Sequence, residues 1–110
     1  MSKIDPDDDV LTLINTVNVD PDRQQELIDL LIEATTDVMR HLDGFVSANL
    51  HSSLDGSHVA NYAQWKSKAH FEAMLGNPEP RIHMEQASAM ANSVKPLLYQ
   101  AVHSDSVPTP

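Results

Sequence analysis

The Asp55-Gly56 pair constrains the fold more than any other feature, because it separates two runs in which apolar and polar residues alternate. An Asp-Gly pair accepts the positive φ angles that a two-residue β-hairpin turn requires. The alternation on either side is typical of half-buried strands. We therefore predict two antiparallel strands, over residues 45–54 and 57–65, joined by this turn.

The segment before this hairpin predicts a strand followed by a helix. Residues 10–19 alternate between a face of leucines and valines around Asn15 and a face of small polar residues around Ile14. Asp20 is expected to cap a helix that begins at Pro21 and runs to about residue 42, where Gly44 stops it. Its inward stripe, at helical spacing, is Leu27, Leu31, Ala34, Val38 and Leu42.

The segment after the hairpin predicts two helices and a last strand. Ser67 is expected to cap a short helix over 68–75, which the run 76–80 breaks. A helix over 81–91, a turn over 92–95 and a strand over 96–103, with proline at its start, complete the pattern. This order predicts an α+β fold, a ferredoxin-like split βαβ with an extra short helix and a four-stranded antiparallel sheet.

Three segments make up the predicted domain organisation: an acidic arm over 1–9, one domain over 10–103 and a polar tail over 104–110. Helices can cover only one face of the predicted sheet. The other face carries Ile14, Ala60 and Tyr62 among small polar residues. A half-apolar face in water is costly, so we expect a second copy to cover it in a two-fold homodimer.

Composition excludes several classes of partner. The chain carries 16 acidic and 7 basic residues, a net charge of −9, which argues against nucleic acid and anionic membranes as partners. It contains no cysteine, so disulfides and cysteine-based metal sites or nucleophiles are excluded. No apolar segment has the length of a signal or a membrane span, and a cytoplasmic protein is the default expectation.

The strand over 57–65 carries the strongest sign of a site. Its alternation puts Asn61 and Trp65 on one face, the face that packs against helices. An asparagine there is either a buried amide bound to backbone or a fixed amide that binds a ligand oxygen. A lone tryptophan is more often core, but the two together predict a pocket between sheet and helices.

Three short runs then resemble the antibiotic biosynthesis monooxygenase family: Gly44-Phe45, residues 51–56 and residues 61–67. The resemblance extends over about residues 10–103. It implies dimers of ferredoxin-like subunits, the dimeric α+β barrel arrangement, with a pocket in each subunit. It further implies that a phenolic polycyclic substrate, anthrone-like and of the aromatic polyketide class, is oxidised to a quinone by O₂. Family members do this without metal, flavin or haem.

The resemblance also assigns site residues. It implies catalytic roles for Asn61, Trp65 and His51. The candidate substrate-binding residues are Arg81, Phe71, His83, Asn49, Asn15 and Met74. Phe71 stands where the family has a tyrosine. Arg81 lies about one helical turn before the position of a family arginine.

Two histidines are candidates for the base that such a reaction needs, His51 and His83. If the hairpin loop holds only Asp55 and Gly56, His51 lies across from Ala60 and faces away from Asn61. A loop one residue longer, with a bulge, puts His51 opposite Asn61. The sequence leaves both registers open.

Two other functions remain open at this stage. Haem-degrading relatives on the same fold use an asparagine, a tryptophan and a histidine, whose positions fall at Asn15, near Met74 and at His83. A small-molecule-binding protein without oxygenase activity is the other alternative, because a fold alone does not fix a function. No two histidines have the close spacing of a metal site, so no metal is expected.

Overall fold

A four-stranded antiparallel sheet is the frame of the molecule. The computed structural model describes residues 10–108, and the predicted arm over 1–9 lies outside them. In spatial order the strands are β2 (Phe45–Ser52), β3 (His58–Trp65), β1 (Leu11–Asn18) and β4 (Ser93–Tyr99). Every neighbouring pair is antiparallel. The predicted split βαβ fold is therefore confirmed.

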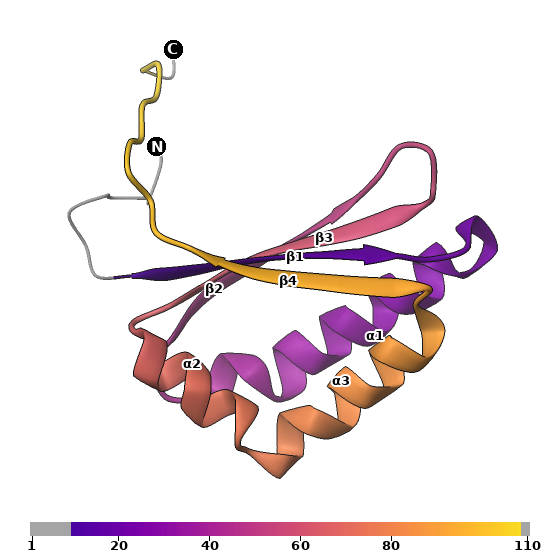
Figure 1. Cartoon of the computed structure of the whole chain (residues 1–110), viewed down its shortest axis with the longest axis horizontal. Coiled ribbons are helices and arrows are strands. Elements are labelled where there is room, and N and C mark those ends of the chain that lie inside the picture. The colour runs from indigo at the N-terminus through magenta and orange to yellow at the C-terminus, as the bar shows by residue number, and fades with distance from the viewer. Residues whose placement is uncertain (1–9, 109–110) are drawn as a thin grey trace.

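All the helices lie on one side of the sheet (Figure 1). They are α1 (Gln24–Asp37), α2 (Lys68–Leu75) and α3 (Pro78–Met90), with short 3-10 turns at Pro21–Arg23 and Met39–His41. Ser67 caps α2 as predicted, since its hydroxyl accepts the N–H of His70. Within residues 10–108, no helix has the length and apolar character needed to cross a membrane.

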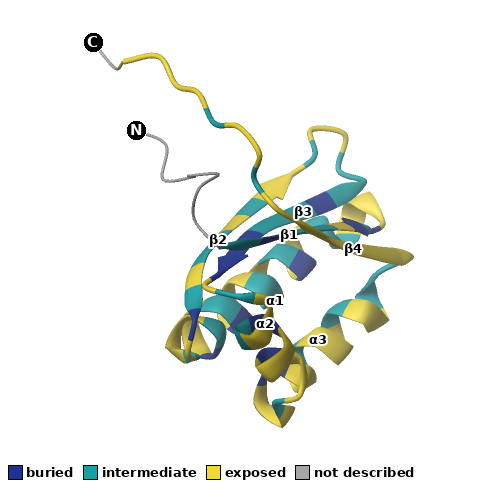
Figure 2. Cartoon of the chain, turned by 60° about the vertical axis from the view of Figure 1, so that its left-hand side comes forward, coloured by how far each residue is buried: buried dark blue, intermediate teal, exposed yellow. Residues whose placement is uncertain are grey.

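The core between sheet and helices consists of two separate clusters. One holds Val17, Val19, Leu27 and Val59, and the other holds Trp65, Phe71 and Met74. The predicted inward stripe of α1 is confirmed, because Leu27, Ala34 and Val38 are buried and Leu31 and Leu42 pack against the clusters. In Figure 2 the outer sides of the helices are exposed, while buried residues face the sheet.

The first helix is shorter than predicted. It ends at Asp37 rather than near residue 42, because Val38 leaves the helical region with φ −125° and ψ −66°. The hydroxyls of Thr35 and Thr36 donate to the helix carbonyls of Leu31 and Ile32 at 2.8 and 2.9 Å. Such β-branched residues, bonded back to their own helix, weaken it, and a 3-10 turn replaces the predicted last turn.

The start of this helix also differs in its cap. Asp20 takes the N-cap position but its side chain makes no capping hydrogen bond. Its carboxylate accepts from Asn92 Nδ2 at 2.9 Å instead. The carboxylate therefore ties the helix start to the loop before β4.

The proline-rich run after α2 begins a helix instead of breaking one. Asn77 caps α3 by accepting the N–H of Glu79 at 3.0 Å, and Pro78 takes the first helical position. The first turn of a helix does not use its N–H groups, so Pro78 and Pro80 fit there. The predicted start at Arg81 was three residues late.

The last strand is also displaced from its prediction. It runs over Ser93–Tyr99 rather than 96–103, with Pro96 inside it opposite Asn15. Proline is tolerated there because β4 is an edge strand, which among the described residues pairs with β1 alone. The predicted turn over 92–95 is therefore mostly strand, and residues 101–108 form no helix or strand.

Within residues 10–108, no helix or strand covers the side of the sheet away from the helices (Figure 1). Ile14 and Tyr62 lie opposite each other on it, and Leu97 lies opposite Ile14. Leu97 is 58% exposed, and Tyr99, on the same face, is 44% exposed. Figure 2 shows β4 exposed along its length. The predicted mixed face is thus exposed at Leu97 and Tyr99, whereas Thr12 and Gln64 on the same face are buried.

The β2–β3 turn contains a carboxylate with an unusual titration. Asp55 accepts from the Ser57 hydroxyl and N–H at 2.6 and 2.9 Å and from the Ser53 hydroxyl at 2.8 Å. These donors, the Ser57 hydroxyl first, lower the pKa of Asp55 from 3.8 to about 2. Because the folded pKa is depressed, the stabilisation is complete above the unfolded pKa and is lost as the pH falls toward 2.

We expect an NMR titration of the Asp55 carboxyl to have its midpoint near 2. Ser57→Ala should raise this midpoint, because it removes the strongest of the donors. Ser52→Ala, in an exposed position at the end of β2, is the matched control and should leave it unchanged. An unshifted midpoint in Ser57→Ala would contradict the assignment.

Candidate active site

A cavity of about 520 Å³ lies between the sheet and the helices. Its volume is typical of sites that enclose a small organic ligand. The cavity separates the two core clusters, since Val17 of one cluster and Trp65 of the other both line it. Small side chains leave this space open, among them Ala34, Ala48 and Ala63.

Two asparagines lie side by side in this cavity. Asn15 of β1 is the direct cross-strand partner of Asn61 of β3, and both line the cavity. The Oδ1 atom of each is buried and has no hydrogen-bond partner. A buried polar atom without a partner costs roughly 1–3 kcal/mol, so a protein keeps one where a ligand supplies the partner. The reading of Asn61 as an amide bound to backbone is therefore not supported.

One wall of the cavity is aromatic. Trp65 is 2% exposed, and its ring meets Phe45 edge to face at a centroid distance of 5.5 Å and an angle of 89°. The ring of Phe71 on α2 also contacts Trp65, at a centroid distance of 6.5 Å and an interplanar angle of 65°. Phe45 reaches this position because a bulge between Phe45 and Ser47 puts it opposite Trp65. Such a wall suits a flat, aromatic ligand.

His83 of α3 is the only ionisable side chain among the described residues that line the cavity. Its side chain is 17% exposed. The Nδ1 atom is buried without a hydrogen-bond partner, and Nε2 lies 3.6 Å from Oε1 of Glu33 on α1. The cavity thus combines apolar walls, two amides whose Oδ1 atoms have no partner, and one imidazole.

The structure brings most of the sequence-predicted site residues together. Six of them line the cavity: Asn15, Asn61, Trp65, Phe71, Met74 and His83. Three others do not line it: His51, Asn49 and Arg81.

His51 and Asn49 lie on the opposite face of the sheet. His51 is exposed and pairs with Ala60, as expected for the two-residue loop. The alternative register, which placed His51 opposite Asn61, is wrong. The bulge of this strand pair lies at its far end instead, near Phe45. Asn49 pairs with Tyr62 and donates to the Tyr62 carbonyl at 3.3 Å.

Arg81 is exposed on the first turn of α3 and donates to the carbonyl of Leu75 at 3.3 Å. The earlier start of α3 accounts for this placement, because it makes Arg81 part of the first turn. The guanidinium therefore closes the α2–α3 connection and does not reach the cavity. Replacement of the family arginine by Arg81 is not supported.

Chemically, this arrangement can hold a planar polycycle against the aromatic wall and bind its oxygen atoms. Each amide offers two N–H donors and one carbonyl acceptor. The neutral imidazole of His83 can accept a proton. Within residues 10–108, no group of three or more histidine and carboxylate side chains has the geometry to hold a metal ion.

Comparison with known proteins shows which family this chain resembles. The model of the antibiotic biosynthesis monooxygenase family matches residues 10–86. The tetracenomycin-F1 monooxygenase of Streptomyces glaucescens is 41% identical over 110 residues, covering 100% of this chain and 97% of that protein.

Solved structures agree with this fold. The ActVA-Orf6 monooxygenase of Streptomyces coelicolor, solved with nanaomycin D, has a TM-score of 0.79 and 28% identity over 96% of each chain. SnoaB, a cofactor-independent oxygenase from Streptomyces nogalater, has a TM-score of 0.76 at 21% identity, over 87% of this chain and 96% of its own. At that identity, the second likeness bears on the fold alone. By its sequence and its fold, this chain belongs to the antibiotic biosynthesis monooxygenase family and is a monooxygenase.

Proposed function

We propose that the enzyme oxidises a phenolic polycyclic substrate, anthrone-like and of the aromatic polyketide class, to a quinone with O₂ and without a cofactor. The observation that carries this proposal is the pair of asparagines, Asn15 and Asn61, whose Oδ1 atoms are buried without partners beside an aromatic wall in an apolar cavity. The 41% identity to a tetracenomycin-F1 monooxygenase supports the substrate class, as does the nanaomycin D bound to a structural relative.

The proposed reaction balances without any further reductant. A ring CH₂ group and O₂ give a ring carbonyl and water. The substrate first loses a proton, and the resulting carbanion or phenolate passes an electron to O₂. Recombination and protonation give a hydroperoxide, and loss of water leaves the quinone carbonyl. The substrate supplies all the electrons, so the protein needs only to position it, remove its proton and stabilise its oxyanion.

The cavity residues then take separate roles. The amide of Asn61, with that of Asn15 beside it, donates to the oxygen on which negative charge develops. The Trp65 N–H is a further donor in this proposal, and its ring and that of Phe71 hold the substrate plane. The apolar walls, Met74 among them, exclude water, which strengthens these hydrogen bonds.

An oxygen-electrode assay with a series of hydroxyanthrones tests this function. We expect O₂ uptake only when a phenolic polycycle is present, with one O₂ consumed per quinone formed. Labelled ¹⁸O₂ should leave one labelled atom in the quinone and one in water. Dialysis against a chelator should leave the rate unchanged.

Three results would overturn the proposal. Binding of these compounds without O₂ uptake would identify a small-molecule-binding protein. Binding of haemin with a Soret shift, together with its breakdown, would identify a haem-degrading enzyme. Restoration of a lost rate by added metal after chelator dialysis would refute the cofactor-independent mechanism.

We further propose that two copies pair through the open face of the sheet, in a cytoplasmic homodimer. Support comes from the exposed apolar side chains of this face, Leu97 and Tyr99, next to Ile14 and Tyr62. A contiguous apolar face of this kind is typical of an interface between subunits. Sedimentation at micromolar concentration should give the dimer mass, and Leu97→Lys should shift it toward the monomer. A monomeric mass for the unchanged protein would contradict this prediction.

A further inference from the structure

We propose that His83 is the base that removes the substrate's phenolic proton and that Glu33 is the positioning residue that fixes its ring. This inference rests on the proposed function, because it needs a substrate with an acidic hydroxyl. The sequence leaves His83 as one of two candidate bases and gives no role to Glu33, which lies on the solvent side of a helix.

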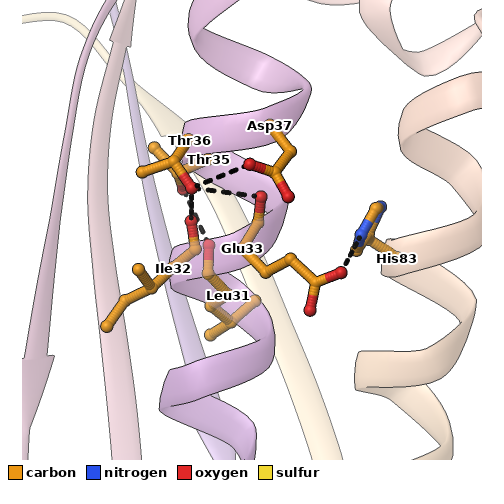
Figure 3. Close-up of polar contacts among 7 residues, drawn as sticks. All are labelled: Leu31, Ile32, Glu33, Thr35, Thr36, Asp37 and His83. Carbon is orange, nitrogen blue, oxygen red and sulfur yellow. Dashed lines mark hydrogen bonds and ion pairs between the residues drawn. The ribbon is translucent and has the colours of Figure 1, made fainter.

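The two side chains meet across the gap between α1 and α3. Figure 3 shows Glu33 extending from α1 toward the imidazole of His83, which reaches back from α3. Nε2 of His83 and Oε1 of Glu33 are 3.6 Å apart. The imidazole is mostly buried at the cavity wall, while the Glu33 side chain is 59% exposed. The carboxylate thus approaches the ring from the solvent side.

This contact favours one tautomer of the neutral ring. Nε2 lies 3.6 Å from the carboxylate, just beyond hydrogen-bond distance, and because a carboxylate can only accept, we place the ring hydrogen on Nε2, toward Glu33. Nδ1 is then left with a free lone pair. That atom is buried and has no partner among the described residues. An acceptor without a partner at the wall of an apolar cavity is suited to receive a hydroxyl proton from a ligand.

The proton transfer is complete within the pair and the substrate. The phenolic O–H bond breaks, its electron pair stays on the oxygen, and a new N–H bond forms at Nδ1 of His83. Glu33 then faces an imidazolium, whose positive charge its carboxylate stabilises. The imidazolium returns the proton to the peroxide after O₂ has added. The amides of Asn15 and Asn61 are placed to bind the phenolate that remains.

Competing bases are absent from this cavity in the part of the chain that the structure describes. The other residues that line it are apolar, aromatic, amide or hydroxyl side chains. His51, the alternative from the sequence, is exposed on the other face of the sheet. The proton must therefore pass to His83 or directly to water.

The first test replaces the base and then supplies it from solution. His83→Ala should lower kcat by about a hundredfold or more, the range typical of general-base removal, with little change in KM. Added imidazole should restore part of this loss, which a merely structural role would not allow. The loss should also shrink with a more acidic phenol, which needs less help to ionise. His41→Ala, an exposed histidine, is the matched control and should change nothing.

The second test concerns the positioning role of Glu33. Glu33→Gln should lower kcat by about two- to fivefold, the range expected for one exposed ion-pair contact. Asp29→Asn, an exposed carboxylate on the same helix that accepts from Gln25, is the matched control and should have no effect. In the double variant with His83→Ala, Glu33→Gln should cause no further loss, because its effect passes through the imidazole.

The outcomes distinguish failure of this inference from failure of the proposed function. No O₂ uptake by the unchanged enzyme with any phenolic polycycle would refute the proposed function and this inference together. An active enzyme whose His83→Ala variant keeps its rate would refute the inference alone. A loss in His51→Gln with none in His83→Ala would identify His51 as the base. Equal, additive losses from Glu33→Gln with and without His83 would refute the positioning role.

Discussion

Asn61→Ala is expected to lower kcat on a phenolic polycycle by on the order of tenfold to a thousandfold, the usual result of removing one oxyanion donor. The amide lies in the cavity beside Asn15, and its Oδ1 has no hydrogen-bond partner among the described residues. In this proposal the Nδ2 group donates to the substrate oxyanion. Steady-state O₂ uptake measures the change, and KM should rise much less than kcat falls.

The stability of this variant should not fall with its activity. Asn61 Oδ1 is buried without a partner, and its desolvation costs about 1–3 kcal/mol of stability. Replacement by alanine removes this cost but leaves a slightly larger cavity, which is unfavourable. These two contributions oppose each other. Urea unfolding should give a free energy of unfolding equal to, or above, that of the unchanged protein.

Asn49→Ala is the matched control, on the same sheet but on the opposite face. It should leave kcat unchanged, and an equal loss there would contradict the placement of Asn49. A folded Asn61→Ala variant with a normal kcat would refute the oxyanion role of Asn61. Trp65→Phe adds an independent check. It keeps the ring contacts with Phe45 and Phe71 but loses the N–H, so its rate should fall more than its stability.

Gly44→Ala is expected to be the most destabilising single substitution in the loop before β2. Gly44 has a φ of +84°, which costs a residue with a Cβ about 1–2 kcal/mol. The new Cβ would also overlap the imidazole of His70, and such overpacking adds about 1–3 kcal/mol. His70 Nδ1 lies 2.7 Å from the hydroxyl of Ser67, the cap of α2. Displacing it therefore disturbs the helix that carries Phe71 and Met74.

Gly56→Ala provides the control in which backbone strain outweighs the new contact. Its φ is +81°, but an added Cβ would lie 3.2 Å from the nearest atom, on Pro21. We expect a loss of only about 1–2 kcal/mol there, from the strained φ. Urea unfolding of the two variants measures the difference, which isolates the overlap with His70. Equal losses at Gly44 and Gly56 would show that the His70 ring moves aside without cost.

Local patterns predicted most of the fold. The Asp55-Gly56 turn fixed the β2–β3 pairing, and alternation put Asn61 and Trp65 on the helix-facing side. Two of the errors came from proline. A rule that treats proline as a breaker fails at Pro78, which begins a helix behind an Asn cap, and at Pro96, which lies in an edge strand. Whether proline fits at these two positions depends on residues that are close in space, and a rule based on local sequence does not include them.

The site residues that lie on one strand were predicted from the sequence, whereas the contact between side chains of two different helices was not. Asn61 and Trp65 follow from period two within β3. Asn15 opposite Asn61 was recoverable in principle, because a polar residue interrupts the apolar face of each strand. Glu33 gave no such signal, since it is an exposed position of α1 whose contact with His83 depends on the packing of α1 against α3.

The division of the core by the cavity makes the substrate a part of the folded protein's packing. A polycyclic ring system that fills the space would contact both apolar clusters and join them. Binding should then carry a negative heat-capacity change, the mark of apolar surface leaving water. At a hundredfold excess over its Kd, a ligand adds about 2.7 kcal/mol to the stability of a protein that binds it only when folded. A rise in melting temperature can thus rank polyketides from cell extracts by fit to the cavity, before any of them is tested for turnover.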